Sequence, residues 1–194
     1  MTNTRKEILQ HHLCSHFSLS KEEADGIASY FQFMVVTREQ SILREREKAS
    51  AIYFITQGIV RSHWSDKQGN DITNFFFKEN QFVTGLDSYL SGKPSPIGIR
   101  TVTDCELLFI QKRDEQNLRE EIPVWSSLFG EFVRQSLMDK VGDVNRRKSV
   151  KAKEQYKDFV STNGDLARRV PLQYIASYLG ITPQTLSRIR RSYT

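Results

Sequence analysis

The sequence has little cysteine and no long apolar run, and each shortage excludes a class of protein. Only two cysteines, Cys14 and Cys105, occur in 194 residues, and they lie far apart. Two thiols cannot build a disulfide framework, nor can they supply the about four thiolates of an iron–sulfur cluster. No stretch approaches the about 18 apolar residues of a membrane span, and the N-terminus lacks the apolar core of a signal peptide. We therefore expect a cytoplasmic protein without a membrane segment.

Acidic residues are scarce in the last quarter of the chain. Residues 146–194 contain 11 Lys and Arg against 3 Asp and Glu, whereas the first 145 residues contain 17 against 20. The formal net charge of +5 is therefore concentrated at one end of the chain. A basic terminal region on a neutral-to-acidic body favours a polyanionic partner over a generally basic, solvated surface.

Residues 170–191 predict two helices joined by a tight turn. Gly180 can adopt the left-handed conformation that ends a helix. Thr182 is a good N-cap for the second helix, and Pro183 suits its first position. Apolar residues recur at helical spacing in the first helix, at Leu172, Ile175, Ala176 and Leu179.

The second of these helices is expected to be basic and rich in amides on its outer face. Leu186 and Ile189 are predicted to face inward. The outer face is expected to hold Gln184, Thr185, Ser187, Arg188, Arg190 and Arg191. Such a helix fits a DNA major groove, where Arg pairs with guanine and Gln with adenine. The alternative is an ordinary helical hairpin with a solvated basic end.

Short β-rich runs fill residues 33–113 and follow a predicted helical segment that ends near Tyr30. In that segment, Ser20 and Glu23 have the spacing of a capping box. Among the runs, Gly58 is expected to mark a bend, and residues 66–71 a hairpin turn around Gly69. Many short strands without intervening helices predict an antiparallel β barrel or jelly roll. We expect its interior to be apolar, lined by Phe75, Phe77, Phe82, Val83 and Ile99. Such an interior either holds an apolar ligand or is filled by its own side chains.

A metal-dependent enzyme is disfavoured, because histidine is also scarce. A metal-binding barrel of the cupin type needs several His and carboxylate ligands on its strands, and only His63 lies in the barrel region. His12 and His16 have a spacing that allows a shared metal on one helix face, but a lone pair of this kind is more often solvated. We therefore predict no metal site and no enzymatic activity.

Asp114 can cap a short helix, and a long helix is predicted to begin after Pro123. Its apolar stripe is too long for a small barrel to cover, so we expect part of it to pack against the same helix of a second chain. The residues expected at this dimer seam are Val124, Leu128, Val133, Leu137, Val141 and Val144. The basic residues 146–151 are expected to form a hinge near Ser149, and a further helix is predicted over 152–162, ending at Asn163 and Gly164.

The order of barrel, long helix, hinge and helix-turn-helix resembles the Crp–Fnr family of bacterial transcription regulators, in a short form found in Bacteroidetes-like sequences. The resemblance covers nearly the whole chain. It is carried by residues 51–61 (AIYFITQGIVR), 103–107 (TDCEL), 140–143 (KVGD) and 170–191. It implies an α+β chain of three parts: a cyclic-nucleotide-binding-like barrel with flanking helices (1–122), a dimerisation helix (123–148) and an all-α DNA-binding domain (149–194).

The effector pocket departs from the pattern of the family it resembles. There, Gly-Glu-Leu and a later Arg-Ser/Thr-Ala bind the ribose and phosphate of a cyclic nucleotide. Here the first element reads Gly85-Leu86-Asp87, and the arginine and the residue after it fall on Ser95 and Pro96. Arg100 and Lys93 are nearby but do not match that position, and Leu137 and Met138 stand where the family contacts adenine. Because a buried phosphate without a cation is costly, we predict that cAMP is not the ligand, and we name no certain cofactor.

The DNA-binding end also departs from the family, since no β-hairpin wing follows the second helix before Thr194. At the family's base-reading positions stand Pro183, Gln184 and Arg188, and proline can donate nothing. Base reading is therefore expected from Gln184 and Arg188. Thr185 and Ser187 suit phosphate or flanking contacts. The backbone contacts are expected from Arg190, Arg191, Lys148, Lys151, Arg168 and Arg169.

The resemblance implies a homodimer in which the state of the barrel sets the spacing of two recognition helices through the long helix. The implied partners are double-stranded DNA, a second copy of the chain, RNA polymerase and an unknown small-molecule effector. The competing hypothesis is a ligand-sensing barrel protein that acts through a protein partner rather than DNA.

Overall fold

The computed structural model describes residues 2–148 and 151–192, and its centre is a jelly roll of two antiparallel sheets. One sheet has the strand order β1-β8-β3-β6 and the other β2-β7-β4-β5. The strands are β1 (Gln32–Val36), β2 (Ser41–Leu43), β3 (Ala51–Gln57), β4 (Val60–Ser65), β5 (Asp71–Phe77), β6 (Phe82–Val83), β7 (Gly98–Thr101) and β8 (Cys105–Gln111). The predicted α+β class and jelly roll are confirmed.

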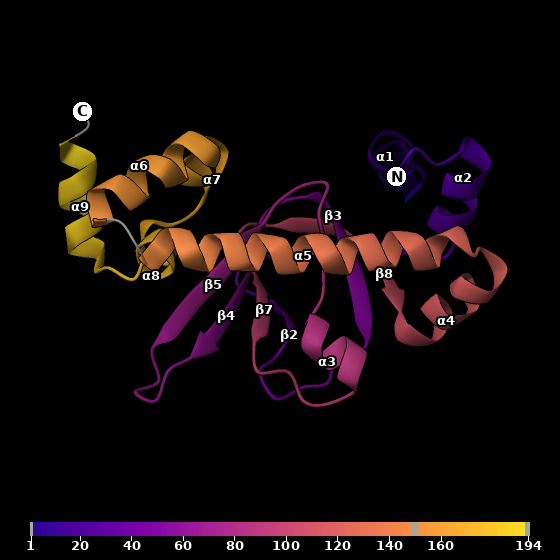
Figure 1. The fold of residues 1–194 in the computed structure, drawn as a ribbon, viewed down its shortest axis with the longest axis horizontal. Coiled ribbons are helices and arrows are strands. Elements are labelled where there is room, and N and C mark those ends of the chain that lie inside the picture. The colour runs from indigo at the N-terminus through magenta and orange to yellow at the C-terminus, as the bar shows by residue number, and fades with distance from the viewer. Residues whose placement is uncertain (1, 149–150, 193–194) are drawn as a thin grey trace.

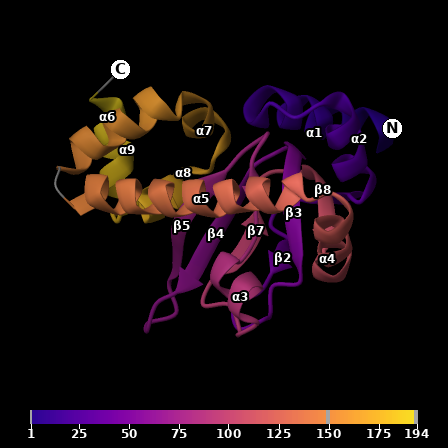
Figure 2. The same cartoon turned by 45° about the vertical axis from the view of Figure 1, so that its right-hand side comes forward.

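Helices precede, interrupt and follow the barrel. They are α1 (Thr2–Phe17), α2 (Lys21–Ser29), α3 (Leu86–Ser91), α4 (Lys112–Glu121), α5 (Val124–Lys148), α6 (Ala152–Thr162), α7 (Gly164–Arg169), α8 (Leu172–Tyr178) and α9 (Pro183–Arg191). α5 runs along the barrel, with α1, α2 and α4 near its start and α6 to α9 gathered near its end (Figures 1 and 2). No helix in residues 2–148 or 151–192 combines the length and apolarity that a membrane crossing requires.

Local signals account for several of these elements. The capping box is present, because the Ser20 side chain accepts from the Glu23 backbone N–H and Glu23 bonds back to Ser20. Gly58 adopts φ +104° between β3 and β4, where a Cβ would lie 2.6 Å from the Asp104 carbonyl oxygen. Gly69 has φ +83° in the β4–β5 hairpin turn. The predicted bend and turn are therefore confirmed.

Two helix boundaries differ from the sequence prediction. Asp114 does not cap α4, because the helix begins earlier, after Gln111. α6 ends at Thr162 as expected, but Gly164 begins the next helix, α7, instead of leading into a loop. The proposed hinge residue Ser149 lies outside the described residues.

The main hydrophobic core lies inside the barrel and continues under the helices at its open side. Leu9 and Leu13 of α1 are fully buried in it, as is Ile27 of α2. Trp125 at the start of α5 is also buried there, and its indole N–H donates to Glu115 Oε1 at 2.7 Å. The N-terminal helices are therefore part of the barrel unit, which fixes their side chains against its interior.

A second hydrophobic core joins the C-terminal helices to the outer face of the barrel. Ile59, Phe76 and Val102 of the barrel pack with apolar residues of α6 to α9. Phe76 lies at ring-centroid distances of 6.3 Å from Phe159 and 5.4 Å from Tyr178. The C-terminal domain is therefore docked on its own barrel in this conformation, mainly through α8 against β5.

Candidate DNA-contacting helix and effector pocket

The two helices predicted within residues 170–191 are present and are joined by a tight turn. α8 and α9 are separated by a turn in which Gly180 has φ +67°. The Thr182 side chain accepts from the Thr185 backbone N–H at 3.2 Å, and Pro183 occupies the first turn of α9. Ile175, Ala176 and Leu186 are buried in the second hydrophobic core, which α8 and α9 share with α6, α7 and the barrel. This packing fixes the orientation of α9 on the domain.

The outer face of α9 carries the side chains expected to reach DNA. Gln184 and Arg188 are exposed, and so are Arg190 and Arg191. Thr185 and Ser187 are partly buried, which agrees with a place at the flank of the contact surface. Leu186 is fully buried and Ile189 partly buried, so the inward face is as predicted. The surface offered to a groove is therefore an amide and three guanidinium groups on a single helix.

We expect Thr182→Ala to lower the free energy of unfolding by about 1 kcal/mol, because the first turn of α9 loses its capping acceptor. Thr182→Asp, which keeps an acceptor, should be close to wild type. Urea denaturation measures both. Equal stability of the Ala and Asp variants would contradict a capping role for Thr182.

Polar contacts reinforce the docking of the C-terminal domain on the barrel. Arg169 of α7 forms two hydrogen bonds with Glu79, at 3.0 and 2.5 Å, and one with Asp165 at 2.7 Å. Tyr174 donates its hydroxyl to Glu39 at 2.7 Å. Because Arg169 is engaged in this way, it is not available for the phosphate contact expected of it. Arg168 and Lys151 remain exposed, and the side chain of Lys148 lies outside the described set.

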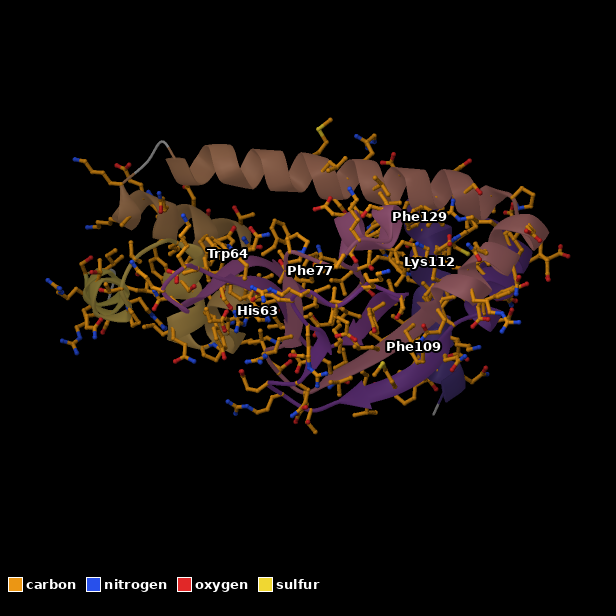
Figure 3. All side chains as sticks on the ribbon, turned by 90° about the horizontal axis from the view of Figure 1, so that it is seen from below. His63, Trp64, Phe77, Phe109, Lys112 and Phe129 are labelled. Atoms are coloured by element: carbon orange, nitrogen blue, oxygen red, sulfur yellow. The ribbon has the colours of Figure 1, made fainter. Side chains whose placement is uncertain are left out.

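Beneath α8 lies an ion pair whose cation is completely buried. Arg61 has an exposed fraction of 0%, pairs with Asp71 and donates to Thr73 at 3.1 Å. Its guanidinium lies 4.1 Å from the centre of the Tyr174 ring. Burial alone would raise the pKa of Asp71, but the hydrogen bonds from Arg61, together with the His63 ring 3.1 Å from the carboxylate, outweigh it and hold that pKa well below its usual range. His63 and Trp64 lie at the end of the barrel nearest the C-terminal helices (Figure 3).

A pocket of about 580 Å³ opens between the barrel, α1 and α5. Its walls come from β5 and β6, from the first turn of α3, from one face of α5 and from the end of α1. The described lining residues are His12, His16, Phe17, Ser62, Phe75, Phe77, Glu79, Asn80, Gln81, Phe82, Val83, Thr84, Leu86, Ile97, Glu131, Phe132, Gln135 and Ser136. This volume is in the range of small-molecule sites.

Of the residues predicted for the effector pocket from the family pattern, only Leu86 lines it. Gly85 is buried behind it, where a Cβ would lie 2.5 Å from Leu43, and the Asp87 side chain is exposed. Ser95 is buried, but its hydroxyl donates to the Ile97 carbonyl at 2.8 Å instead of facing a ligand.

Arg100 and the two α5 residues also lie elsewhere. Arg100 is the register partner of Arg61 and therefore lies on the same, outer face of the sheet. Ser62, the next residue along β4, points to the opposite face and lines the pocket. Leu137 and Met138 are 50% and 60% exposed. Among the α5 side chains that the structure describes, Gln135 and Ser136, directly before these two, do line the pocket.

The predicted apolar lining is largely confirmed, although Ile99 differs. Phe75, Phe77, Phe82 and Val83 do line the pocket, whereas Ile99 is fully buried in the core. The sequence reasoning missed the contribution of α1. His12 and His16 stack on each other with ring centroids 4.4 Å apart and line the pocket; His12 is buried and His16 is exposed, so only one member of the pair is solvated.

Burial is the main cause that lowers the pKa of His12 to about 4, with repulsion from His16 and His11 adding to it. The imidazole is therefore neutral at pH 7. The folded pKa lies below the ordinary 6.5, so the unfolded chain binds a proton first as the pH falls. The contribution of the neutral His12 to the free energy of unfolding is therefore fully present above about pH 6.5 and is lost as the pH falls toward 4.

We expect His12→Gln to remove part of the decrease in unfolding free energy between pH 6.5 and 4, because the buried base that must stay neutral is gone. His11→Gln, at an exposed position of the same helix, serves as the comparison: it removes only the smallest cause of the His12 shift and should retain most of the wild-type pH dependence. Urea midpoints measured across this pH range give the comparison. Parallel pH profiles for the His12→Gln variant and the wild type would contradict the assignment.

The dimer-seam residues predicted on α5 divide into two groups. Leu128 is 4% exposed and belongs to the core of its own barrel, so the prediction that it faces a second chain is wrong. Val124 and Val133 pack partly against the same core. Leu137 is exposed, while the side chains of Val141 and Val144 are not among those described. In Figure 3, Phe129 marks the face of α5 that is turned toward the barrel.

Residues 33–121 match the family described as the cyclic nucleotide-binding domain. The c-di-GMP responsive global regulator CLP of Xanthomonas campestris is 17% identical, with a TM-score of 0.71, and the match covers 90% of this chain and 91% of that one. FixK2 from Bradyrhizobium japonicum is 16% identical, with a TM-score of 0.70 and coverages of 84% and 83%. A Eubacterium rectale protein described as a transcriptional regulator of the Crp/Fnr family is 12% identical, with a TM-score of 0.73 and coverages of 94% and 87%. No curated protein matches the sequence.

Proposed function

We propose that this chain is a homodimeric, DNA-binding transcription regulator, because residues 33–121 match the cyclic nucleotide-binding domain family and the chain shares its fold with Crp/Fnr transcription regulators. Its effector pocket is altered, and cAMP is not its ligand. Regulatory descriptions of the structural neighbours support a non-enzymatic role. DNA, a second copy of the chain, RNA polymerase and a small-molecule effector are its partners.

The observation that carries this proposal is the outer face of α9. Gln184 and Arg188 are exposed near the start of a helix that Thr182 caps and Leu186 anchors. A short, rigid helix with these groups can enter a major groove and bond bidentately to adenine and guanine. Arg190 and Arg191 at its end supply positive charge for the flanking phosphates.

The test is selection of bound sequences from a random duplex library, followed by anisotropy titration of the enriched duplex. We expect a palindrome with half-sites about one helical turn apart, roughly 34 Å. We also expect affinity to fall by about 10³-fold or more between 50 and 200 mM salt if about six phosphates are contacted. No binding to any duplex at low salt would refute the proposed function.

Dimerisation is proposed to occur through the part of α5 that its own barrel leaves uncovered. Leu137 and Met138 are adjacent and half or more exposed on a helix whose earlier turns are packed. Exposed apolar side chains of this kind on a long helix suit a coiled-coil-like seam with the same helix of a second chain.

We expect Leu137→Asp to raise the dimer dissociation constant at least about tenfold, because a charge would be buried in each half of the seam. Leu90→Asp is the matched control, since Leu90 is also an exposed leucine, at 55%, but belongs to α3 and not to α5. Sedimentation equilibrium measures both variants. An unchanged dissociation constant for Leu137→Asp would place the seam elsewhere.

A further inference from the structure

The pocket between α1, α5 and the barrel has walls that are largely aromatic. Phe75 and Phe77 of β5 lie 5.3 Å apart between ring centroids, and Phe82 and Phe132 lie 5.8 Å apart. Phe17 of α1 completes this set. Because these rings are tilted at several angles around the pocket, an aromatic ligand can contact both ring faces and ring edges. Aromatic pairs prefer such offset-stacked or edge-to-face arrangements over direct face-to-face stacking.

Both carboxylates that line the pocket are already paired on its outside. Glu79 binds Arg169 and accepts the Gly58 backbone N–H at 2.7 Å. Glu131 binds Arg134, with Arg134 Nε 2.7 Å from Glu131 Oε2. Neither arginine lines the pocket. The charges of the two carboxylates are therefore neutralised by these arginines, and the pocket has no excess negative charge that would favour a cationic ligand.

A counterion for an anionic ligand is missing from the lining that the structure describes. None of its residues is Lys or Arg, and the buried imidazole of His12 is neutral at pH 7 because burial lowers its pKa to about 4. The other imidazole of the lining, His16, is exposed to water and does not lie in the buried part of the pocket. A phosphate or sulfonate placed there would lose water without gaining a cation and would lie near Glu79 and Glu131. The polar groups that remain are amides and hydroxyls, from Asn80, Gln81, Gln135, Ser62, Thr84 and Ser136.

We propose that this pocket binds an uncharged, aromatic small molecule whose polar substituents bond to the amides and hydroxyls of its rim. The volume of about 580 Å³ suits a ligand of drug-like size. The inference deepens the proposed function by naming the class of its effector, although ligand binding itself does not depend on DNA binding.

The test compares two fluorescent probes that share an anilinonaphthalene framework and differ in charge. Phenylnaphthylamine is neutral, and anilinonaphthalene sulfonate carries one negative charge. For the full-length protein we expect saturable binding of one neutral probe per chain, at least tenfold tighter than the sulfonate. We also expect no displacement of the neutral probe by cAMP. Equal or tighter binding of the sulfonate, or displacement by cAMP, would overturn the proposal.

Matched variants locate the probe. Ser136→Phe fills the pocket from α5 and should weaken binding of the neutral probe at least tenfold. Ser127→Phe places the same side chain on an exposed position of the same helix outside the pocket and should leave binding unchanged. Circular dichroism checks that both variants fold. Undiminished binding to the Ser136→Phe variant would show that the probe sits elsewhere and would overturn the proposal.

A variant that adds charge provides a second measurement that does not depend on filling the pocket. Gln135→Lys puts a cation at the pocket rim and should strengthen sulfonate binding about tenfold while leaving the neutral probe within a factor of about three. Ser127→Lys should change neither. No gain for the sulfonate in Gln135→Lys would contradict the electrostatic argument. DNA titration is separate: probe binding without any DNA binding would refute the proposed function and leave this inference standing.

Discussion

Replacing Arg188 by Ala should weaken binding to the selected operator by about 30-fold or more. Arg188 is exposed on α9, one turn after Gln184, where a guanidinium can bond bidentately to guanine. Each such contact contributes about 1–3 kcal/mol of discrimination, and a symmetric dimer makes it twice, so about 2–6 kcal/mol is at stake. Anisotropy titration at fixed salt measures the loss.

Two further variants separate base reading from simple charge. Arg188→Lys keeps the cation but not the planar fork, so we expect it to retain the salt dependence and to lose sequence preference. Arg44→Ala removes an exposed arginine of the barrel, remote in sequence from α9, and should bind DNA as the wild type does. If Arg188→Ala also binds like the wild type, the alternative of a protein partner in place of DNA gains support.

The pair of helices α8 and α9 could be predicted from the sequence because its determinants are local. A glycine that takes positive φ at residue 180, a capping threonine two residues later and a proline at the first helical position act within a few residues of one another. The barrel was predictable for the same reason, since its turns at Gly58 and Gly69 are fixed by local backbone demands.

The pocket could not be predicted in the same way, because its composition depends on how distant elements are packed. Alternation along β4 indicates that Arg61 and Ser62 face opposite sides, but only the three-dimensional structure places Ser62 toward the ligand space and Arg61 under α8. A shift of one or two residues on α5 likewise separates the exposed Leu137 from the lining residues Gln135 and Ser136. The family pattern pointed at α5, at the two residues that directly follow the described lining residues of the pocket.

The docking of the C-terminal domain on the barrel could not be predicted from the sequence either. Arg169 looks like one more basic residue of a DNA-binding domain, yet its partner Glu79 lies 90 positions earlier, on the barrel. Glu79 also lines the pocket between α1, α5 and the barrel. One carboxylate therefore touches both this pocket and the domain that carries α9.

The buried Arg61–Asp71 pair offers the clearest way to disturb this docking. We expect Asp71→Ala to lower the free energy of unfolding by about 1–3 kcal/mol, because Arg61 would stay buried without its counterion. The expected loss is smaller than for a pair buried on both sides, since Asp71 is 41% exposed and water can reach it. Arg61→Met, which removes the charge itself, should cost less than Asp71→Ala. Urea denaturation of the two variants decides the order.

The pH dependence of the same pair has a definite sign. The folded pKa of Asp71 lies below its unfolded value, so the pair stabilises the protein above pH about 4 and loses that contribution as the pH falls further. Asp71→Ala should flatten this part of the acid-denaturation curve, and the exposed Asp87→Ala should not. Because Arg61 stacks on Tyr174 of α8, loss of the pair should also free the C-terminal domain, seen as faster proteolysis between the barrel and α8 in Asp71→Ala. Unchanged proteolysis together with lowered stability would show that Arg61 supports the barrel and leaves the docking of α8 to the apolar contacts of Phe76.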